Sequence, residues 1–227
     1  MASATAQTVA LFRLTDEELH LLGAADDVDT PYLDRLEPDQ RGVAVDVAYR
    51  SLLAHGVCEA QDGGLLVPDE LVQLLQVRAG PERAYRIEVR SQGGRSIRHL
   101  YEAGGTTVCE DISADGVHDF DVRPVSDSQL LLTEKLGPPA NGVVLRAAWR
   151  AIGDRDLQGS PPPWGAVSAT ADLTVRTPGA PGDLVSVIWG DAGTYLISEV
   201  PVSPSEDGSS WTMASLVAGY LGIERAS

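Results

Sequence analysis

The segment Tyr101–Val108 reads YEAGGTTV and aligns residue by residue with WGDAGTYL at Trp189–Leu196. In both segments a glycine turn joins two strand-like stretches, a pattern typical of a β-hairpin. The helices expected after them also end alike, in Lys135-Leu136-Gly137 and Tyr220-Leu221-Gly222. Two copies are too few for a solenoid. The sequence therefore predicts two related halves, unless two antiparallel meanders resemble each other by chance.

The residues before the first copy alternate as a half-buried strand does. In Arg83–Arg90, the side chains of Tyr85, Ile87 and Val89 share one face and charged residues occupy the other. Turns then separate three more strands and a helix, at Ser96–Tyr101, Thr106–Cys109, Val117–Val122 and Ser126–Gly137. The second half repeats this order, with strands at Thr170–Arg176, Leu184–Trp189 and Gly193–Ile197 and a helix that ends at Gly222.

Residues 15–79 have the spacing of helices. A capping box of Thr15 and Glu18 begins the first helix. The second helix stops at Gly56 and places four apolar residues at helical spacing, namely Val43, Val47, Leu52 and Leu53. A turn at Asp62-Gly63-Gly64 leads to a third helix at Pro68–Val77.

These elements predict an α+β fold made of a quasi-twofold duplicated unit, with a central antiparallel β-sheet flanked by helical bundles. Val143–Ile152 is expected to be a helix between the halves, and Ser160–Pro163 a stiff connector. The predicted organisation is one domain, residues 1–227, of two related halves. These are 1–140 (helices 15–79, sheet and helix 83–137) and 141–227 (helix, strands and a short C-terminal helix).

The charge of the chain argues against several classes of partner. Its 227 residues hold 17 Lys and Arg against 33 Asp and Glu, a formal net charge of −16. Phosphate backbones and anionic lipids attract basic surfaces, so we expect neither nucleic-acid binding nor membrane insertion. No basic, apolar leader is recognised in Met1–Phe12. Cys58 and Cys109 are expected to be free thiols rather than a bridge, which suits a cytoplasmic protein.

No motif for catalysis or metal binding is recognised. The sequence lacks a P-loop, a GxGxxG turn, a GxSxG elbow and paired His or Cys ligands. His118 and Phe120 should share one strand face while Asp119 and Asp121 share the other, so only the two aspartates could hold an ion. We interpret the six acids of residues 101–122 as a solvated surface that aids solubility, with an acidic rim for a cationic partner as the alternative. No catalytic, cofactor-binding or metal residue is predicted, and the chain is not expected to be an enzyme.

The tryptophans of the second half are the candidates for contact with a protein partner. All four lie in this half, and large rigid rings are favoured at interfaces. Trp189, within a strand, is interpreted as a core residue. The predicted partner-binding residues are Trp149, Trp164, Tyr195 and Trp211.

Several motifs resemble the EspG family. They are SLLAHGV at Ser51–Val57, DGGL at Asp62–Leu65, the helix Pro68–Val77 and the Gly80-Pro81-Glu82 turn that leads into strands. The run Val187–Leu196 carries the tryptophan, acidic residue and tyrosine that the family often has there, with Thr194 in place of an arginine. The resemblance indicates a divergent and short member of that family.

The resemblance implies a cytosolic chaperone of type VII (ESX) secretion with a quasi-twofold fold. Such a protein would bind the apolar tip of a helical secreted client, PPE-like or WXG-like, without catalysis or cofactor. A small-molecule-sensing or degenerate enzyme domain on a duplicated sheet is the alternative. A winged-helix regulator is less favoured, because the candidate recognition helix Pro68–Val77 has no Lys or Arg and opens with Asp69 and Glu70. The sequence leaves the client and the oligomeric state open.

Overall fold

The computed structural model describes residues 12–24, 29–136, 146–147, 165–179, 182–191 and 193–198. By its internal contacts the chain divides into two compact units. The first comprises residues 1–81 and 101–125, and the second comprises residues 82–100 and 126–227. These units are defined by packing, whereas the predicted halves 1–140 and 141–227 are defined by the repeat. The division into related halves stays a prediction.

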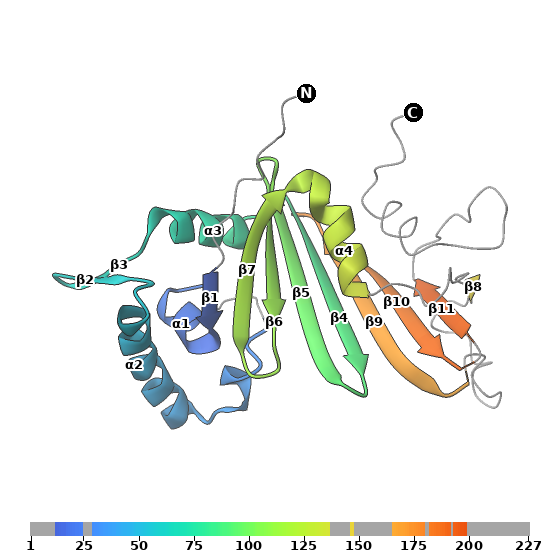
Figure 1. The fold of residues 1–227 in the computed structure, drawn as a ribbon, viewed down its shortest axis with the longest axis horizontal. Helices are drawn as coiled ribbons and strands as arrows, with labels where there is room; N and C mark the ends of the chain where they lie inside the picture. The colour runs from blue at the N-terminus through green and yellow to red at the C-terminus, as the bar shows by residue number, and fades with distance from the viewer. Residues whose placement is uncertain are drawn as a thin grey trace. The chain divides into compact units, whose positions relative to one another are not determined.

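The first unit combines an antiparallel sheet with helices (Figure 1). Its strand order is β1 (Phe12–Thr15), β7 (Val117–Pro124), β6 (Thr106–Ile112) and the last residues of β5 (Gly94–Ala103). Residue Leu14 pairs with His118, and Glu110 pairs with Phe120. The helical elements are α1 (Asp16–Leu21), η1 (Leu33–Arg35), α2 (Pro38–Ala54) and α3 (Asp69–Ala79). A two-stranded hairpin joins β2 (Glu59–Gln61) to β3 (Gly64–Leu66).

Local signals explain where these helices begin and end. The predicted capping box is confirmed, because Thr15 Oγ1 accepts the Glu18 amide while the Glu18 carboxylate accepts the Thr15 amide. Helix α2 begins with a proline and has a second box, between Glu37 and Gln40. Its chain turns away at Gly56, whose φ of 68° suits glycine.

The second unit has the strand order β5, β4 (Arg83–Ser91), β9 (Val167–Arg176), β10 (Asp183–Gly190), β11 (Gly193–Ser198) and β8 (Arg146–Ala147). Neighbours are antiparallel from β4 to β11, and β8 is parallel to β11. Helix α4 (Ser128–Leu136) follows the short helix η2 (Val125–Asp127) and packs against β4. Tyr85, Ile87 and Leu173 are fully or almost fully buried in this unit.

The predicted α+β class with an antiparallel sheet and several helices is confirmed. Within the second unit, the hairpin-linked pairs β5–β4 and β9–β10 meet through the antiparallel pair β4–β9. A duplicated unit would give this arrangement, but the duplication itself stays a prediction.

Two local predictions are wrong, and one strand was missed. Residues 15–79 are not wholly helical, because the turn at Asp62–Gly64 joins two strands of three residues each, too short for alternation to reveal. Strand β1 before Asp16 was not predicted, since it is defined by its pairing with β7. Strand β8, Arg146–Ala147, lies where a helix over Val143–Ile152 was expected and pairs with β11 instead.

Other predicted elements lie outside the described residues, including the connector Ser160–Pro163 and the helix that ends at Gly222. Within the described part of the chain, every helix is too short or too polar to cross a bilayer.

Candidate functional site

A cluster of ionisable side chains lies buried in the first unit. We call it the buried polar network; its members are Asp16, Arg78, Tyr101, Glu110 and His118. Glu110 accepts hydrogen bonds from Arg78 Nε (3.1 Å) and Nη2 (3.2 Å), from the Tyr101 hydroxyl (2.7 Å) and from His118 Nδ1 (2.7 Å). Arg78 also donates to the carbonyl of Ala24.

Asp16 links this network to the turn before α2. Its Oδ1 accepts a hydrogen bond from His118 Nε2 at 2.6 Å. Its Oδ2 accepts the backbone amides of Tyr32 (2.6 Å) and Leu33 (3.0 Å). Both ring nitrogens of His118 face carboxyl groups, which accept hydrogen bonds when ionised, so this geometry favours the imidazolium form of the ring.

The pKa shifts agree with charged partners. Burial alone would raise the pKa of Glu110, but the hydrogen bond from His118 and the charge of Arg78 outweigh it and hold that pKa at about 2. Burial opposes the charge of His118, but its bonds to Asp16 and Glu110 raise its pKa. Burial also raises the pKa of Tyr101 well above its usual value, so its hydroxyl stays a donor. Glu110 thus lies between two basic partners, Arg78 and His118.

The members of the buried polar network are enclosed in the first unit and hydrogen-bonded to one another. The side chains of Asp16, Glu110 and His118 have no exposed surface. A general acid or base must come within hydrogen-bond reach of a substrate, and these groups are already occupied by one another. In the described residues, each fully buried side-chain nitrogen and oxygen has a hydrogen-bond partner. The network therefore ties α1, η1 and α3 to strands β5, β6 and β7.

The prediction that the six acids of residues 101–122 form a solvated surface is corrected for two of them. Glu110 is fully buried and Glu102 is 9% exposed. Asp119 and Asp121 do face away from His118, as predicted, and each pairs at 2.6 Å with an arginine, Arg13 or Arg123. Among the described residues there is no group of three or more His, Cys, Asp or Glu side chains that could hold a metal ion.

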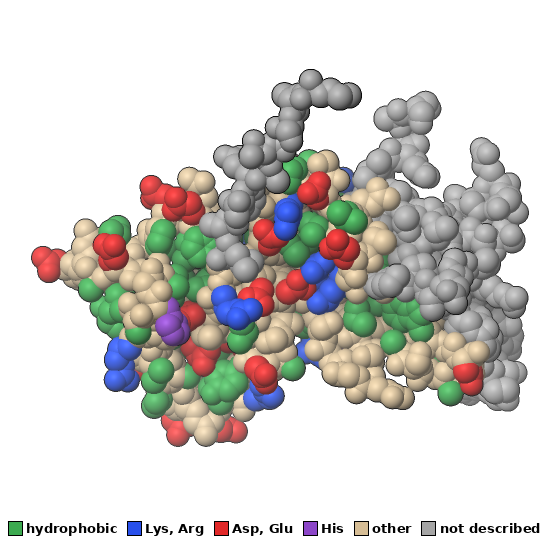
Figure 2. All heavy atoms as spheres, in the orientation of Figure 1, with side chains coloured by type: hydrophobic (Ala, Val, Ile, Leu, Met, Phe, Trp, Pro, Cys, Tyr) green, Lys and Arg blue, Asp and Glu red, His purple; other side chains and the backbone are tan. Residues whose placement is uncertain are grey.

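The accessible candidate site is an open groove of about 510 Å³ beside α2. We call it the α2 groove; its lining residues are Glu17, Tyr32, Leu36, Asp39, Gln40, Val43, Ala44 and Val47. Val43 is 65% exposed and Val47 is 49% exposed. Figure 2 shows hydrophobic side chains at the surface over α2, with charged side chains around them. An open, apolar surface of this kind suits a macromolecular partner better than a small ligand, which needs an enclosing pocket.

The structure does not test the predicted partner-binding residues. Trp149, Trp164 and Trp211 lie outside the described residues. Tyr195 lies in β11, where its backbone is opposite Ile188 of β10 and Arg146 of β8. Their role in binding stays a prediction.

Sequence reasoning did not single out the α2 groove, although it placed Val43 and Val47 in the correct helix. The missed signal is that the apolar residues of α2 surround the helix. Ala48 and Leu52 lie on the buried face of α2, whereas Val43 and Val47 lie on another face of the same helix and are exposed.

The described residues thus define an α+β protein with an antiparallel sheet, a buried structural network and an open apolar groove. No family model matches the sequence, and no curated protein matches it either. Among solved structures, the chain is similar to the type VII secretion system chaperone EspG5 of Mycobacterium tuberculosis, whose structure was determined in complex with the PE25–PPE41 dimer. The two chains are 13% identical, with a TM-score of 0.58.

The aligned region covers 92% of this chain and 93% of the other. At this level of identity the comparison shows a shared fold alone, which agrees with the α+β fold that the sequence resemblance implied, while the quasi-twofold duplication stays a prediction. The expectation that this chain is shorter than members of that family stays a prediction.

Proposed function

We propose that this chain is a non-catalytic, cytoplasmic, chaperone-like protein that binds a helical secreted protein of the PPE-like or WXG-like type. The observation that carries the proposal is the fold shared with EspG5 over 92% of the chain. EspG5 is a chaperone of type VII secretion and was captured with a PE25–PPE41 dimer. A chaperone of this kind covers apolar surface on its client that would otherwise aggregate.

Two features of the described residues support binding over catalysis. Asp16, Glu110 and His118 are hydrogen-bonded to one another in the buried polar network, where a substrate has no access to them. The accessible surface beside α2 instead presents apolar side chains. Apolar surface that is exposed on a free monomer is a common mark of a protein interface.

We further propose that part of the client surface lies in the second half of the chain, at Trp149, Trp164, Tyr195 and Trp211. Aromatic rings are enriched among the residues that dominate binding energies. Replacing each by Ala, one at a time, should weaken client binding if this surface is used.

Co-expression tests the proposed function. The full chain would be produced with small helical secreted proteins encoded near its own gene and analysed by size-exclusion chromatography. We expect a stoichiometric complex with one of them, and the client should be insoluble when produced alone. If every candidate stays insoluble or elutes separately, the proposed function is wrong, and a small-molecule binding screen would test the alternative.

A further inference from the structure

We propose that Asp62, at the tip of the β2–β3 hairpin, is a site of spontaneous isomerisation to isoaspartate. The backbone amide of Gly63 attacks the Asp62 carboxyl group and closes a succinimide ring, which water then opens. This site lies in the first unit and does not depend on the proposed function. The sequence contains the Asp-Gly pair three times, at residues 62–63, 115–116 and 207–208, and the last pair lies outside the described residues.

The reaction needs no reagent other than water. The Gly63 nitrogen loses its proton and bonds to Asp62 Cγ, while the protonated carboxyl group loses its hydroxyl, so a water molecule leaves. Hydrolysis returns the water. Attack of water on the side-chain carbonyl of the ring restores aspartate, and attack on its main-chain carbonyl gives isoaspartate, in which the main chain runs through Cγ. No group is oxidised or reduced in either step.

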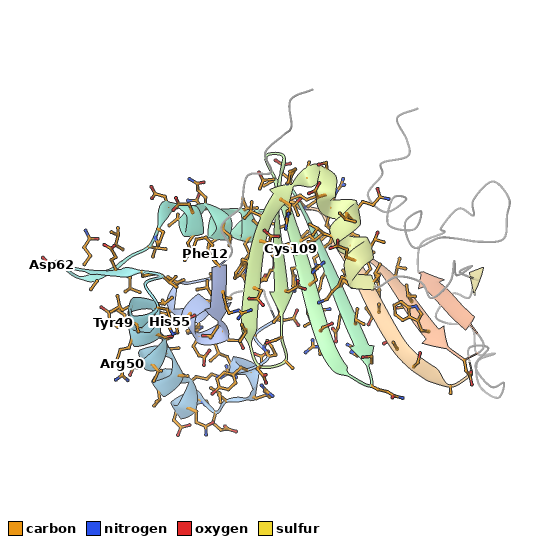
Figure 3. The ribbon with its side chains drawn as sticks, in the orientation of Figure 1. Phe12, Tyr49, Arg50, His55, Asp62 and Cys109 are labelled. Atoms are coloured by element: carbon orange, nitrogen blue, oxygen red, sulfur yellow. The ribbon has the colours of Figure 1, made fainter. Side chains whose placement is uncertain are left out.

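The tip of the hairpin leaves the attacking amide accessible. Gln61 and Gly64 pair across the two strands, so Asp62 and Gly63 form the turn between them. Both turn residues are exposed, and Asp62 lies at the outward end of the hairpin (Figure 3). Among the described residues, no backbone carbonyl accepts a hydrogen bond from the Gly63 amide. A Cβ built on Gly63 would have no neighbour within 4 Å.

The geometry of this turn also explains why glycine follows Asp62. The φ of Gly63 is 92°, a value that residues with a side chain rarely adopt, so the turn favours glycine. Glycine is the neighbour that hinders ring closure least, because it has no Cβ beside the attacking nitrogen. The hairpin therefore places an unhindered amide next to an exposed carboxyl group.

The pair Asp115-Gly116, in the β6–β7 turn, offers the same chemistry in a closed setting. Asp115 is exposed, but the Gly116 amide donates to the carbonyl of Ser113 at 3.1 Å. The Gly116 carbonyl accepts the Asp16 amide at 2.9 Å. A Cβ built on Gly116 would lie 2.5 Å from Tyr32 Cβ, so the surroundings leave no room for the turn to move. Ring closure at Asp115 must first break these hydrogen bonds.

Isoaspartate at residue 62 should open the hairpin. It adds a carbon atom to the main chain within a two-residue turn, so Gln61 and Gly64 can no longer keep their register. Each strand has only three residues, and a hairpin of two strands is marginally stable on its own. We therefore expect the amides of β2 and β3 to exchange faster with solvent after isomerisation.

Peptide-resolved mass spectrometry of the full chain tests the proposal. After incubation, digestion and electron-transfer fragmentation would locate isoaspartate at residues 62 and 115. The position matters because Asn141-Gly142 and the pair at 207–208 can form the same ring. We expect Asp62 to isomerise at least about fivefold faster than Asp115, because Asp115 must first release the hydrogen bonds of Gly116. In guanidinium chloride, which removes the fold, the two rates should become similar.

Asparagine variants make the same comparison with a simpler readout. In Asp62→Asn and Asp115→Asn the ring closes with loss of ammonia, and hydrolysis then raises the mass of the peptide. We expect Asp62→Asn to deamidate at least about fivefold faster than Asp115→Asn in the folded chain. Asp62→Glu is the matched control, since it keeps the charge and its longer side chain does not form the succinimide. Its hairpin amides should exchange at a constant rate throughout the incubation.

Three results would overturn the proposal. The first is equal rates at the two sites in the folded chain, or a difference that persists in guanidinium chloride. The second is the absence of isoaspartate at residue 62 after a time in which it forms in the unfolded chain. The third is hairpin exchange that rises as much in Asp62→Glu as in the wild-type chain.

Discussion

Replacing Glu110 by Gln should destabilise the protein more than any exposed substitution. Glutamine keeps the size of the side chain and removes its charge. Three donors lose their anionic acceptor: the guanidinium of Arg78, the imidazolium of His118 and the hydroxyl of Tyr101. Two of them are cations that would remain buried, with the Arg78 side chain only 4% exposed.

The size of the loss follows from the burial and the pKa of Glu110. Breaking a buried ion pair by removing one partner costs about 3–5 kcal/mol. Independently, the difference between a usual pKa of 4.5 and a folded value of about 2 corresponds to about 3 kcal/mol. Such a loss is a large part of the about 5–15 kcal/mol by which a domain is stable. For a chain of this length, a loss of about 3–5 kcal/mol should lower the melting temperature by roughly 6–20 °C.

The sign of the pH dependence gives a second measurement. The pKa of Glu110 is lowered on folding, so its contribution is present above pH 4.5 and is lost as the pH falls towards 2. The pKa of His118 is raised, so its contribution is present below its usual 6.5 and is lost as the pH rises through the raised value. In Glu110→Gln the acid limb should flatten, and the alkaline limb should move to lower pH because His118 loses one carboxylate.

Urea unfolding followed by circular dichroism, from pH 2 to pH 9, measures both effects. Glu59→Gln, in the exposed strand β2, is the matched control and should change stability by less than about 0.5 kcal/mol. A loss below about 1 kcal/mol for Glu110→Gln at pH 7, or an acid limb identical to wild type, would refute the charged network described above.

Two further substitutions probe the same unit by urea unfolding. Thr15→Ala removes the side-chain acceptor of the α1 capping box and should cost about 1 kcal/mol; an unchanged midpoint would mean that the box is dispensable. Gly116→Ala should cost about 2 kcal/mol or more, because φ is +75° and the new Cβ would lie 2.5 Å from Tyr32 Cβ and 2.7 Å from Asp16 Oδ2. A neutral Gly116→Ala would contradict the close approach of the β6–β7 turn to Tyr32.

Sequence reasoning succeeded where the determining signal is local. Alternation predicted a strand at Arg83–Arg90, and β4 spans Arg83–Ser91. The glycine turn at Gly104-Gly105 joins β5 to β6 as expected, and both glycines have positive φ. The same reasoning missed β1 and β8, because a strand of two to four residues is specified by its partner strand rather than by its own composition.

The buried polar network was beyond local reasoning for a related reason. The alternation of β7 correctly placed His118 on the face of Phe120, but its partner Asp16 lies 102 positions away in the sequence. A titratable residue on an apolar strand face indicates a buried charge. Glu110 also shows this pattern, because it shares a face of β6 with Val108 and Ile112. Such a residue needs a buried counter-charge, although the sequence alone does not say from which element it comes.

The closed form of the buried polar network also constrains how this protein can evolve. Every member of the network is hydrogen-bonded to at least one other member. A substitution that an exposed ion pair would tolerate therefore leaves a buried charge without its partner here. Single steps away from Asp16, Glu110 or His118 therefore pass through a poorly folded intermediate, whereas simultaneous replacement by apolar residues would not. Among descendants of a common ancestor, we expect these positions to be retained together or lost together.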